Sequence, residues 1–394
     1  MKIAFTIFGG TAWTGGINYL SNILSAISES PSNNLEPVLF HAPDADPSAI
    51  QKLAHHLSSP PITIDEWGNK DPQKLKARVA SILCNSAAER HFTRQGIDVV
   101  FQSGVWYGLL FPIPTLAWIP DFQHKHLPYM FGRLNNLKRD IGYAALSHSA
   151  TRILVSSEDA RKDCETFLPK SRSKISVLPF SVKPSTEINN LNRAIIAKKY
   201  SLPQKYFYLP NQFWKHKNHT AVLEALRHLK HRGRKDIAIA VTGNPNDFRN
   251  PEHPRNIFDA VERNDLSESF RFLGMIPYED ISLLIRGSIA VINPSLFEGW
   301  STTVEEAKSL GAPLILSDLP VHREQAGSEA TYFDPHDPIA LADILINTYD
   351  TSLSISDKQR LESEFISHQK YLESRKNFSL KITEIFKLTA SSNN

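Results

Sequence analysis

The chain has 394 residues, of which 41% are hydrophobic and 10% aromatic, and it carries 44 Lys and Arg against 41 Asp and Glu. This length and composition fit about two globular domains with a large apolar core, and they exclude a mini-protein, a fibrous protein and gross disorder. Residues 1–185 carry 19 basic and 15 acidic groups, a weaker basic bias than nucleic-acid binders usually show.

The first half of the chain alternates short β-branched runs with segments of helical period. The amino terminus, MKIAFTIFGG, is too short for the apolar region of a signal peptide and predicts a first strand. Apolar residues then recur at helical spacing in residues 17–27 and 75–88. The predicted strands are residues 2–8, 37–40, 98–102, 115–118, 152–155 and 175–178.

A second series of the same kind follows a break at residues 181–204, where the string SVKPSTEINN and a short basic helix indicate a domain boundary. Its predicted strands are residues 206–209, 237–242, 270–273, 290–292, 313–316 and 331–333. Residues 339–388 predict two or three helices, interrupted near 352–356. Both halves therefore predict doubly wound parallel sheets that bind ligands at the carboxyl ends of their strands, and two such halves would enclose a cleft.

The cysteine content and the hydropathy indicate where the protein works. Cys84 and Cys164 fit neither a disulfide framework nor a zinc site, which favours a reducing, cytoplasmic location. No stretch approaches the roughly 20 apolar residues of a membrane span, so we expect any membrane contact to be peripheral, at the inner face.

Residues 290–311, AVINPSLFEGWSTTVEEAKSLG, combine a buried strand, a loop and a helix start. Thr302 as N-cap with Glu305 three residues later predicts a capping box. Glu306 has no capping duty, and with Glu298 it can contact two ends of one ligand, while the amides of residues 301–303 favour an anion such as a diphosphate. The alternative is that Glu298 is a turn residue and Glu306 a solvated helix glutamate.

The string FEGWSTTVEEAKSLG resembles the E-x7-E signature of the retaining nucleotide-sugar glycosyltransferases of family 4, and APLILSDLPVHREQAG resembles that family's next strand and loop. The resemblance covers most of the carboxyl half. It implies that Glu298 reaches the donor sugar and that Glu306 binds the ribose hydroxyls. The loop that meets the sugar and the diphosphate would be Gly299, Trp300, Ser301, Thr302 and Thr303, although Trp-Ser-Thr-Thr replaces the family's aromatic-Gly-Leu-Pro portion.

Two further segments of the carboxyl half carry candidate binding residues. In PNQFWKHKNH, residues 210–219, Lys215 and Lys217 can neutralise a diphosphate leaving group, or else they belong to a solvated helix start. This string resembles the family's phosphate-binding segment, with Asn211 where an Arg is common. FRFLGMIPYEDISLL resembles the segment whose backbone meets the nucleotide base, here at Gly274, Met275 and Ile276.

A glycine-rich string, GGTAWTGGINYL, follows the first predicted strand. Its glycines permit a close approach of backbone to a phosphate or a sugar, but it is not a G-x-G-x-x-G fingerprint, and a flexible turn is the alternative. By resemblance, Gly15 and Gly16 belong to the family's amino-terminal glycine loop, which borders the donor phosphates.

The string TLAWIPDFQHKHLPYMF, residues 115–131, gathers Asp121, His124 and His126 after another strand. Family members commonly have His-Asp here. Asp121 matches that Asp, Pro120 occupies the His position, and His124 would replace the missing His or else lie on the surface. A metal site at His124 and His126 is a weaker interpretation, because no third ligand has suitable spacing.

Two last features bear on the reaction class and on the acceptor. Asp44-Ala45-Asp46 has the D-x-D form of metal-dependent glycosyltransferases, yet its Pro-bounded context is typical of a turn before a helix. The apolar residues around Trp106, Tyr107 and Phe111, which include Leu109 and Leu110, predict core packing, with an apolar wall beside the acceptor as the alternative.

The resemblance implies the GT-B architecture, with an N-terminal acceptor-side domain at 1–185, a nucleotide-sugar-binding domain at 186–375 and a helix at 376–394 that crosses back to the first domain. It also implies a retaining, hexosyltransferase-type enzyme of polysaccharide biosynthesis that needs neither a metal nor a cofactor. Its partners would be a nucleotide-sugar donor and a glycan, lipid-linked or small-molecule acceptor. A phosphorylase, an epimerase and a non-catalytic nucleotide-sugar-binding module remain the alternatives.

Overall fold

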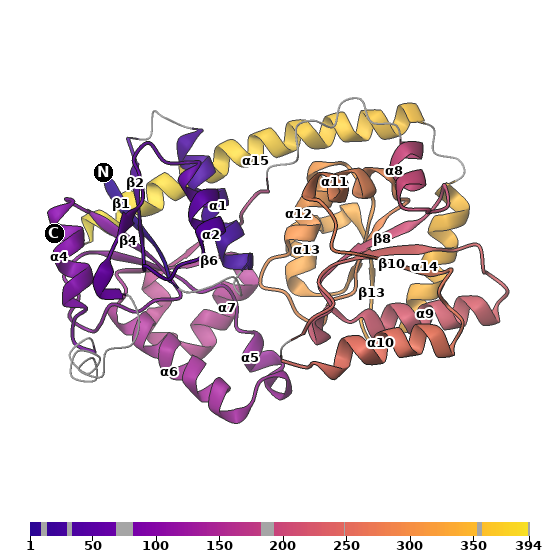
Figure 1. Cartoon of the computed structure of the whole chain (residues 1–394), viewed down its shortest axis with the longest axis horizontal. Helices are drawn as coiled ribbons and strands as arrows, with labels where there is room; N and C mark the ends of the chain where they lie inside the picture. Colours follow the sequence, from indigo (N-terminus) through magenta and orange to yellow (C-terminus); the bar gives the residue numbers. More distant parts are fainter. Residues whose placement is uncertain are drawn as a thin grey trace. The chain divides into compact units, whose positions relative to one another are not determined.

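A computed structural model describes residues 1–8, 14–29, 34–67, 82–182, 193–247, 249–352 and 357–392 (Figure 1). The chain forms two compact units. The first contains Met1–Phe122, Arg133–Ser181 and Ser374–Asn394, and the second contains Gln123–Gly132 and Val182–Glu373. The segment Gln123–Gly132 therefore packs with the second unit although its flanks belong to the first, which the sequence does not predict. Gly9, Gly10 and residues 75–81 of the helix predicted at 75–88 lie outside the described residues, and in the rest of that prediction helix α4 begins only at Ser86.

The first unit is built on a parallel sheet of seven strands in the order β3-β2-β1-β4-β5-β6-β7. Its strands are β1 (Lys2–Ile7), β2 (Glu36–His41), β3 (Ile62–Thr63), β4 (Val99–Ser103), β5 (Thr115–Trp118), β6 (Arg152–Val155) and β7 (Ile175–Val177). Its helices are α1 (Thr14–Ser28), α2 (Pro47–Ala54), η2 (Asp65–Trp67), α4 (Ser86–Arg94), α6 (Arg133–Ser149), α7 (Glu158–Phe167) and η4 (Pro169–Lys174). The six predicted strands are confirmed, and the short edge strand β3 was not predicted.

The second unit contains a parallel sheet of six strands in the order β10-β9-β8-β11-β12-β13. Its strands are β8 (Phe207–Pro210), β9 (Ile239–Thr242), β10 (Phe270–Gly274), β11 (Val291–Asn293), β12 (Leu314–Ser317) and β13 (Ala330–Phe333). Its helices are α5 (Gln123–His126), η3 (Pro128–Met130), α8 (Arg193–Lys199), η6 (Lys215–Lys217), α9 (His219–His231), α10 (Glu252–Arg263), α11 (Tyr278–Gly287), α12 (Thr302–Ser309), α13 (Pro320–Ala326), η7 (Gly327–Glu329) and α14 (Pro338–Thr351). All six predicted strands are confirmed.

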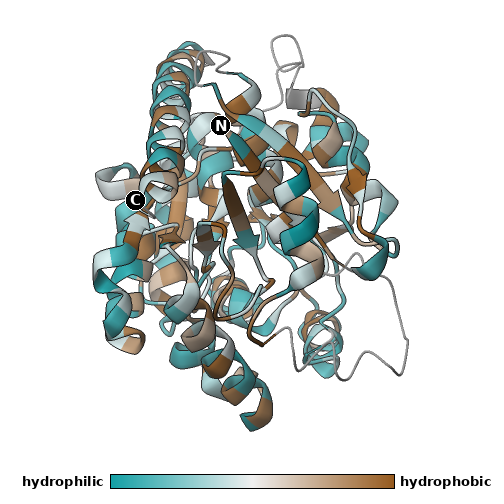
Figure 2. Cartoon of the chain, turned by 90° about the vertical axis from the view of Figure 1, so that its left-hand side faces the viewer, coloured by the Kyte–Doolittle hydropathy of each residue, from teal (hydrophilic) through white to brown (hydrophobic). Residues whose placement is uncertain are grey.

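Burial on both faces explains why the strands read as continuous apolar runs. In β1, five of the six residues are buried, and Phe5 stacks on Phe101 of β4 with ring centroids 5.4 Å apart. The strands of this sheet are largely brown, that is hydrophobic, in Figure 2. Parallel sheets carry helices on both faces, so the alternation of polar and apolar residues typical of a half-exposed strand is absent here.

The last helix, α15 (Asp357–Ser391), contributes to both units. In the second unit its Glu364 accepts a hydrogen bond of 2.6 Å from Arg286. In the first unit Arg375 is buried and pairs with Glu29 at 2.9 Å, and Phe386 packs edge-on against Phe5 with centroids 6.2 Å apart. The helix predicted at 376–394 is thus the final part of a longer helix that begins at Asp357.

The residues proposed as an acceptor wall divide into buried and exposed ones. Tyr107 is fully buried, and its hydroxyl shares a hydrogen bond of 2.8 Å with Thr6. Trp106 donates to Ser149 at 2.9 Å, whereas Leu109 and Leu110 are exposed. The predicted packing role is therefore correct for Tyr107.

Among the helices of the described part of the chain, no long apolar one could cross a lipid bilayer.

We expect Tyr107→Ala to lower the free energy of unfolding by about 3–5 kcal/mol, because it empties a fully buried aromatic position. Leu110→Ala, at an exposed position, should change it by about 0.5 kcal/mol or less. Urea denaturation of both variants measures the difference. Equal stability of Tyr107→Ala and the parent protein would contradict the packing role.

Candidate functional site

The candidate site lies where β8 and β11 end side by side in the second sheet. The chain runs from β8 to β9 and β10 on one side and then returns to β11 on the other, so the strand order reverses between these two strands. In open parallel sheets such a reversal leaves room for a ligand at the carboxyl ends of the strands. Asn211 follows β8, and Asn293 is the last residue of β11.

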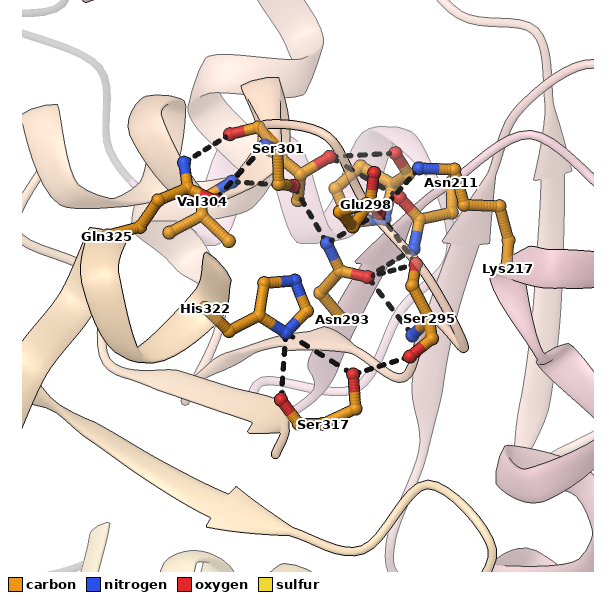
Figure 3. Close-up of polar contacts among 12 residues, drawn as sticks. Asn211, Lys217, Asn293, Ser295, Glu298, Ser301, Val304, Ser317, His322 and Gln325 are labelled. Carbon is orange, nitrogen blue, oxygen red and sulfur yellow. Dashed lines mark hydrogen bonds and ion pairs between the residues drawn. The ribbon is translucent and has the colours of Figure 1, made fainter. Parts of the chain in front are cut away.

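A buried ion pair joins the segments that follow these two strands (Figure 3). The ammonium nitrogen of Lys217 lies 2.6 Å from Oε1 of Glu298, and the two side chains are 16% and 8% exposed. The Ser295 hydroxyl donates to the same oxygen at 2.7 Å, and the Asn293 amide does so at 3.4 Å. The structure therefore brings together two of the predicted catalytic residues, and Glu298 is not a solvated turn residue.

The charge state of Glu298 is fixed by its neighbours. Burial raises the pKa of its carboxyl group, but Lys217 and then the His322 and His216 rings outweigh burial and lower the pKa to about 2. Burial also lowers the pKa of His216, to about 3, so this ring is neutral at neutral pH. Glu298 is therefore an ionised acceptor of hydrogen bonds rather than a proton donor.

Asn293 organises the polar groups around the ion pair. Its side-chain oxygen accepts hydrogen bonds from the Asn211 side-chain amide at 3.2 Å and from the Ser295 backbone N–H at 3.4 Å, and its own amide donates to the Ser301 hydroxyl at 2.8 Å. The Asn211 oxygen in turn accepts from Thr303 at 3.4 Å. Asn211 therefore holds Asn293 and Thr303 in place through hydrogen bonds within the protein. The sequence analysis missed Asn293 and Ser295, although their place at the end of a central strand was a usable signal.

The start of α12 differs from the capping box that the sequence predicts. Ser301, not Thr302, is the N-cap, and its hydroxyl accepts from the Val304 amide at 3.4 Å. This puts Glu305 one position too late for a capping box, and it accepts instead from Gln325 at 3.0 Å. The prediction was wrong because both residues are good N-caps and only the extended backbone at Ser301 (φ −90°, ψ 114°) selects between them.

The predicted anion-binding amides also need a correction. The Ser301 amide donates to the Gln325 side chain at 3.1 Å, so it is already used within the protein. The amides of Thr302 and Thr303 belong to the first turn of α12, where a helix lacks internal acceptors, and no residue within the described ranges accepts from them. The predicted anion site at this helix end would therefore have two amides rather than three.

Glu306 lies on the next turn of α12 and is partly buried. Burial raises the pKa of its carboxyl group to about 7, although a hydrogen bond of 3.1 Å from the Tyr278 hydroxyl acts in the opposite direction. Near neutral pH this carboxyl group is thus half-ionised, and a ligand that donates hydrogen bonds to it would favour the ionised form. Tyr278 was not predicted from the sequence.

The two predicted lysines have different surroundings. Lys217 is held by Glu298, whereas Lys215 is exposed and its ammonium lies 5.9 Å from the centre of the Tyr129 ring. Arg249, which the sequence analysis did not select, lies 4.7 Å from the centre of the Trp214 ring and 5.4 Å from that of Phe131. Three cationic side chains therefore follow strands β8 and β9.

The segment Gln123–Gly132 borders this group of residues. His126 stacks on Phe297, the residue before Glu298, with ring centroids 5.1 Å apart. His124 is buried on α5, with its ring edge-on to Phe131 at 6.5 Å. Asp121 belongs to the first unit, where its backbone oxygen accepts from Tyr143 at 3.1 Å.

The predicted glycines are placed on two different elements. Gly15 and Gly16 lie in the first turn of α1 rather than in a loop, and neither has a positive φ, so their freedom of backbone conformation is not used there. Gly274 has φ +75°, and its carbonyl accepts from the Gly243 amide at 3.1 Å. Met275, which follows it, is 70% exposed, and Ile276 is partly buried.

The D-x-D string has a structural explanation. Asp46 is the N-cap of α2, and its carboxylate accepts from the Ser48 amide at 2.9 Å. No group of three or more His, Cys, Asp or Glu within the described part of the chain could hold a metal ion.

Part of the carboxyl half of the chain matches a known protein family. Residues 192–361 match the model of the family described as "Glycosyl transferases group 1". The match spans less than half of the chain. All the carboxyl-half site residues described above, from Asn211 to Gln325, lie within it.

Two curated proteins share sequence with the chain. It is 32% identical to O-antigen chain mannosyltransferase B of Escherichia coli over 97 residues. This aligned stretch covers 24% of this chain and 26% of that protein. It is 25% identical to O-antigen chain mannosyltransferase RfbU of Salmonella typhimurium over 157 residues. This stretch covers 40% of this chain and 42% of that protein. The chain thus matches less than half the length of either relative.

The fold extends the likeness to the whole chain. The crystal structure of Anabaena Alr3699/HepE in complex with UDP and glucose is similar over 98% of each chain, with a TM-score of 0.69 and 14% sequence identity. At this identity the likeness concerns the fold, which is the GT-B fold of two Rossmann-like α/β domains with parallel sheets.

We expect Lys217→Met to lower the free energy of unfolding at pH 7 by about 3 kcal/mol, because it leaves a buried carboxylate without its cation. The stabilisation that comes from the lowered pKa of Glu298 is fully present above pH 4.5 and is lost as the pH falls through about 2. The deficit should therefore shrink in acid.

Lys215→Met is the matched control, since Lys215 is exposed and should change the stability by about 0.5 kcal/mol or less. Urea denaturation at pH 7 and at pH 3 measures both variants. An equal effect of the two substitutions would show that the ion pair does not stabilise the domain.

Proposed function

We propose that the protein is a retaining glycosyltransferase of family 4 that transfers a hexose from a nucleotide-sugar donor to a glycan or lipid-linked acceptor. The observation that carries this proposal is the buried Lys217–Glu298 pair at the strand-order reversal, within the residues that match glycosyl transferases group 1. A cation and an ionised carboxylate at one ligand-binding edge match a donor with a charged leaving group and a hydroxylated sugar.

The donor would be bound by three groups of residues. Lys217 has three N–H donors and gives one to Glu298, so the others can reach a diphosphate, together with the amides of Thr302 and Thr303 and the side chain of Lys215. Glu306 would accept hydrogen bonds from the ribose hydroxyls. The backbone of Gly274, Met275 and Ile276 would meet the base, and Gly299 and Trp300 the sugar.

The chemistry that we infer is electrostatic. Negative charge develops on the diphosphate as the sugar–phosphate bond breaks, and positioned N–H groups stabilise that charge. Glu298 would hold the sugar through its hydroxyl groups, because its low pKa keeps it an acceptor. In this proposal the donor is also contacted by Asp121, which belongs to the first unit, and by His124, which lies on the segment Gln123–Gly132 of the second unit, while Gly15 and Gly16 border its phosphates.

The acceptor proposal is supported by the curated relatives, which are O-antigen chain mannosyltransferases. We infer a place in polysaccharide biosynthesis, at the cytoplasmic face of a membrane if the acceptor carries a lipid. The proposed domains are 1–185 for the acceptor, 186–375 for the donor and a helix at 376–394 that returns to the first domain.

We expect Glu306→Ala to weaken nucleotide-sugar binding by about 1.5–3 kcal/mol, the contribution of a charged hydrogen bond. Because the ionised carboxylate is the better acceptor, the affinity of the parent protein should rise as the pH increases through about 7, and the affinity of Glu306→Gln should lack this component. Isothermal calorimetry with a donor found by thermal-shift screening of nucleotide sugars measures both effects.

Glu305→Ala is the control, since Glu305 contacts Gln325 and Lys308 within the protein and should affect stability rather than affinity. If no nucleotide sugar shifts the melting temperature, or if Glu306→Ala binds like the parent, the donor site is assigned wrongly.

We also expect full transfer activity in excess EDTA, because Lys217 and the α12 amides supply the positive charge that a metal ion would provide. Glu298→Gln should weaken the hold on the donor sugar and lower the rate of transfer. A rate that vanishes with EDTA and returns with Mn²⁺ would contradict the mechanism, and undiminished transfer by Glu298→Gln would remove Glu298 from it.

A further inference from the structure

Helix α6 carries a row of large apolar side chains in solvent. Leu134, Leu137 and Ile141 are 74%, 55% and 61% exposed. At about 100° per residue they fall within about 60° of one another around the helix, so they form one stripe. Leu146, on another face, is buried in the core of the first unit. In Figure 2, brown and teal segments alternate along α6, the lowest helix of the view.

Two basic side chains flank this α6 stripe. Arg133 and Lys138 lie on either side of it around the helix, and both are exposed. The 3-10 helix η4 packs against α6, and its Lys174 donates to the carbonyls of His148 and Ala150 at the end of α6. Together α6 and η4 contain six Lys and Arg and one acidic residue, Asp140.

Single exposed leucines are ordinary on protein surfaces, but three in line between cations are the pattern of a helix that lies in a lipid–water interface. Apolar side chains enter the acyl region there, while Lys and Arg meet anionic headgroups. A symmetric contact between two copies of the chain would instead bring Arg133 and Lys138 of one copy near the same cations of the other, and like charges oppose such a contact.

We propose that the α6 stripe, Leu134, Leu137 and Ile141 with Arg133 and Lys138, docks the protein on an anionic lipid surface. It deepens the proposed function, because docking there would present the first unit to a lipid-linked acceptor. The test measures membrane binding without any transfer reaction, so it can fail while the transferase proposal stands, and the reverse also holds.

The experiment is sedimentation of the full chain with vesicles of phosphatidylcholine, with and without phosphatidylglycerol. We expect binding only to the anionic vesicles and a decrease with salt. Leu137→Glu/Ile141→Glu should reduce the partition coefficient about tenfold or more, because two inserted side chains are lost. Arg133→Glu/Lys138→Glu should reduce it on the order of fivefold or more per residue.

The matched control is Leu361→Glu/Phe365→Glu on α15, which changes two equally exposed apolar residues of another helix and should leave vesicle binding unchanged. Nucleotide binding and circular dichroism confirm that each variant is folded. The proposal is overturned if the parent ignores anionic vesicles, if the α6 variant binds like the parent, or if the control loses binding equally. Ultracentrifugation showing a dimer that Leu137→Glu/Ile141→Glu dissociates would assign the face to a second copy.

Discussion

The buried ion pair between Lys217 and Glu298 is the constraint on which the site depends. A carboxylate removed from water is costly unless a cation and hydrogen-bond donors compensate it, and here the cation comes from a segment 81 residues away. Only the pairing of β8 with β11 brings the two segments together. The domain must therefore pack correctly for its site to carry the right charges. The parallel sheet brings the two segments together, and the polar residues that follow its central strands compensate the buried charges.

Sequence reasoning recovered the elements that depend on local pattern. Buried parallel strands read as short apolar runs, which is why all twelve longer strands could be predicted, and a two-residue edge strand such as β3 carries too little pattern. The charged residues Glu298, Lys217 and Glu306 could be selected because charge at a strand or helix end is conspicuous. Their chemical environment could not, since burial and partners arise from segments distant in the chain.

The predictions that were wrong, and the residues that were missed, also depend on contacts between segments distant in the chain. From the sequence alone, Ser301 and Thr302 are equally good helix N-caps. The hydrogen bonds of Ser301 with Asn293 and Gln325 distinguish the two residues. Arg249 lacks any local signal, because its neighbours Trp214 and Phe131 come from elsewhere in the sequence. The segment Gln123–Gly132 likewise packs with the second unit through ring contacts such as that of His126 with Phe297, and the sequence does not reveal these contacts.

The helix α15 has a consequence for the order of folding during synthesis. The core of the first unit includes Phe386, and its buried Arg375 pairs with a glutamate 346 residues earlier. A chain emerging from the ribosome completes the second unit, which ends at Glu373, before it can complete the first. The amino-terminal sheet must therefore wait with part of its apolar surface uncovered until the last helix is released, which makes that interval the one in which aggregation or chaperone binding competes with folding.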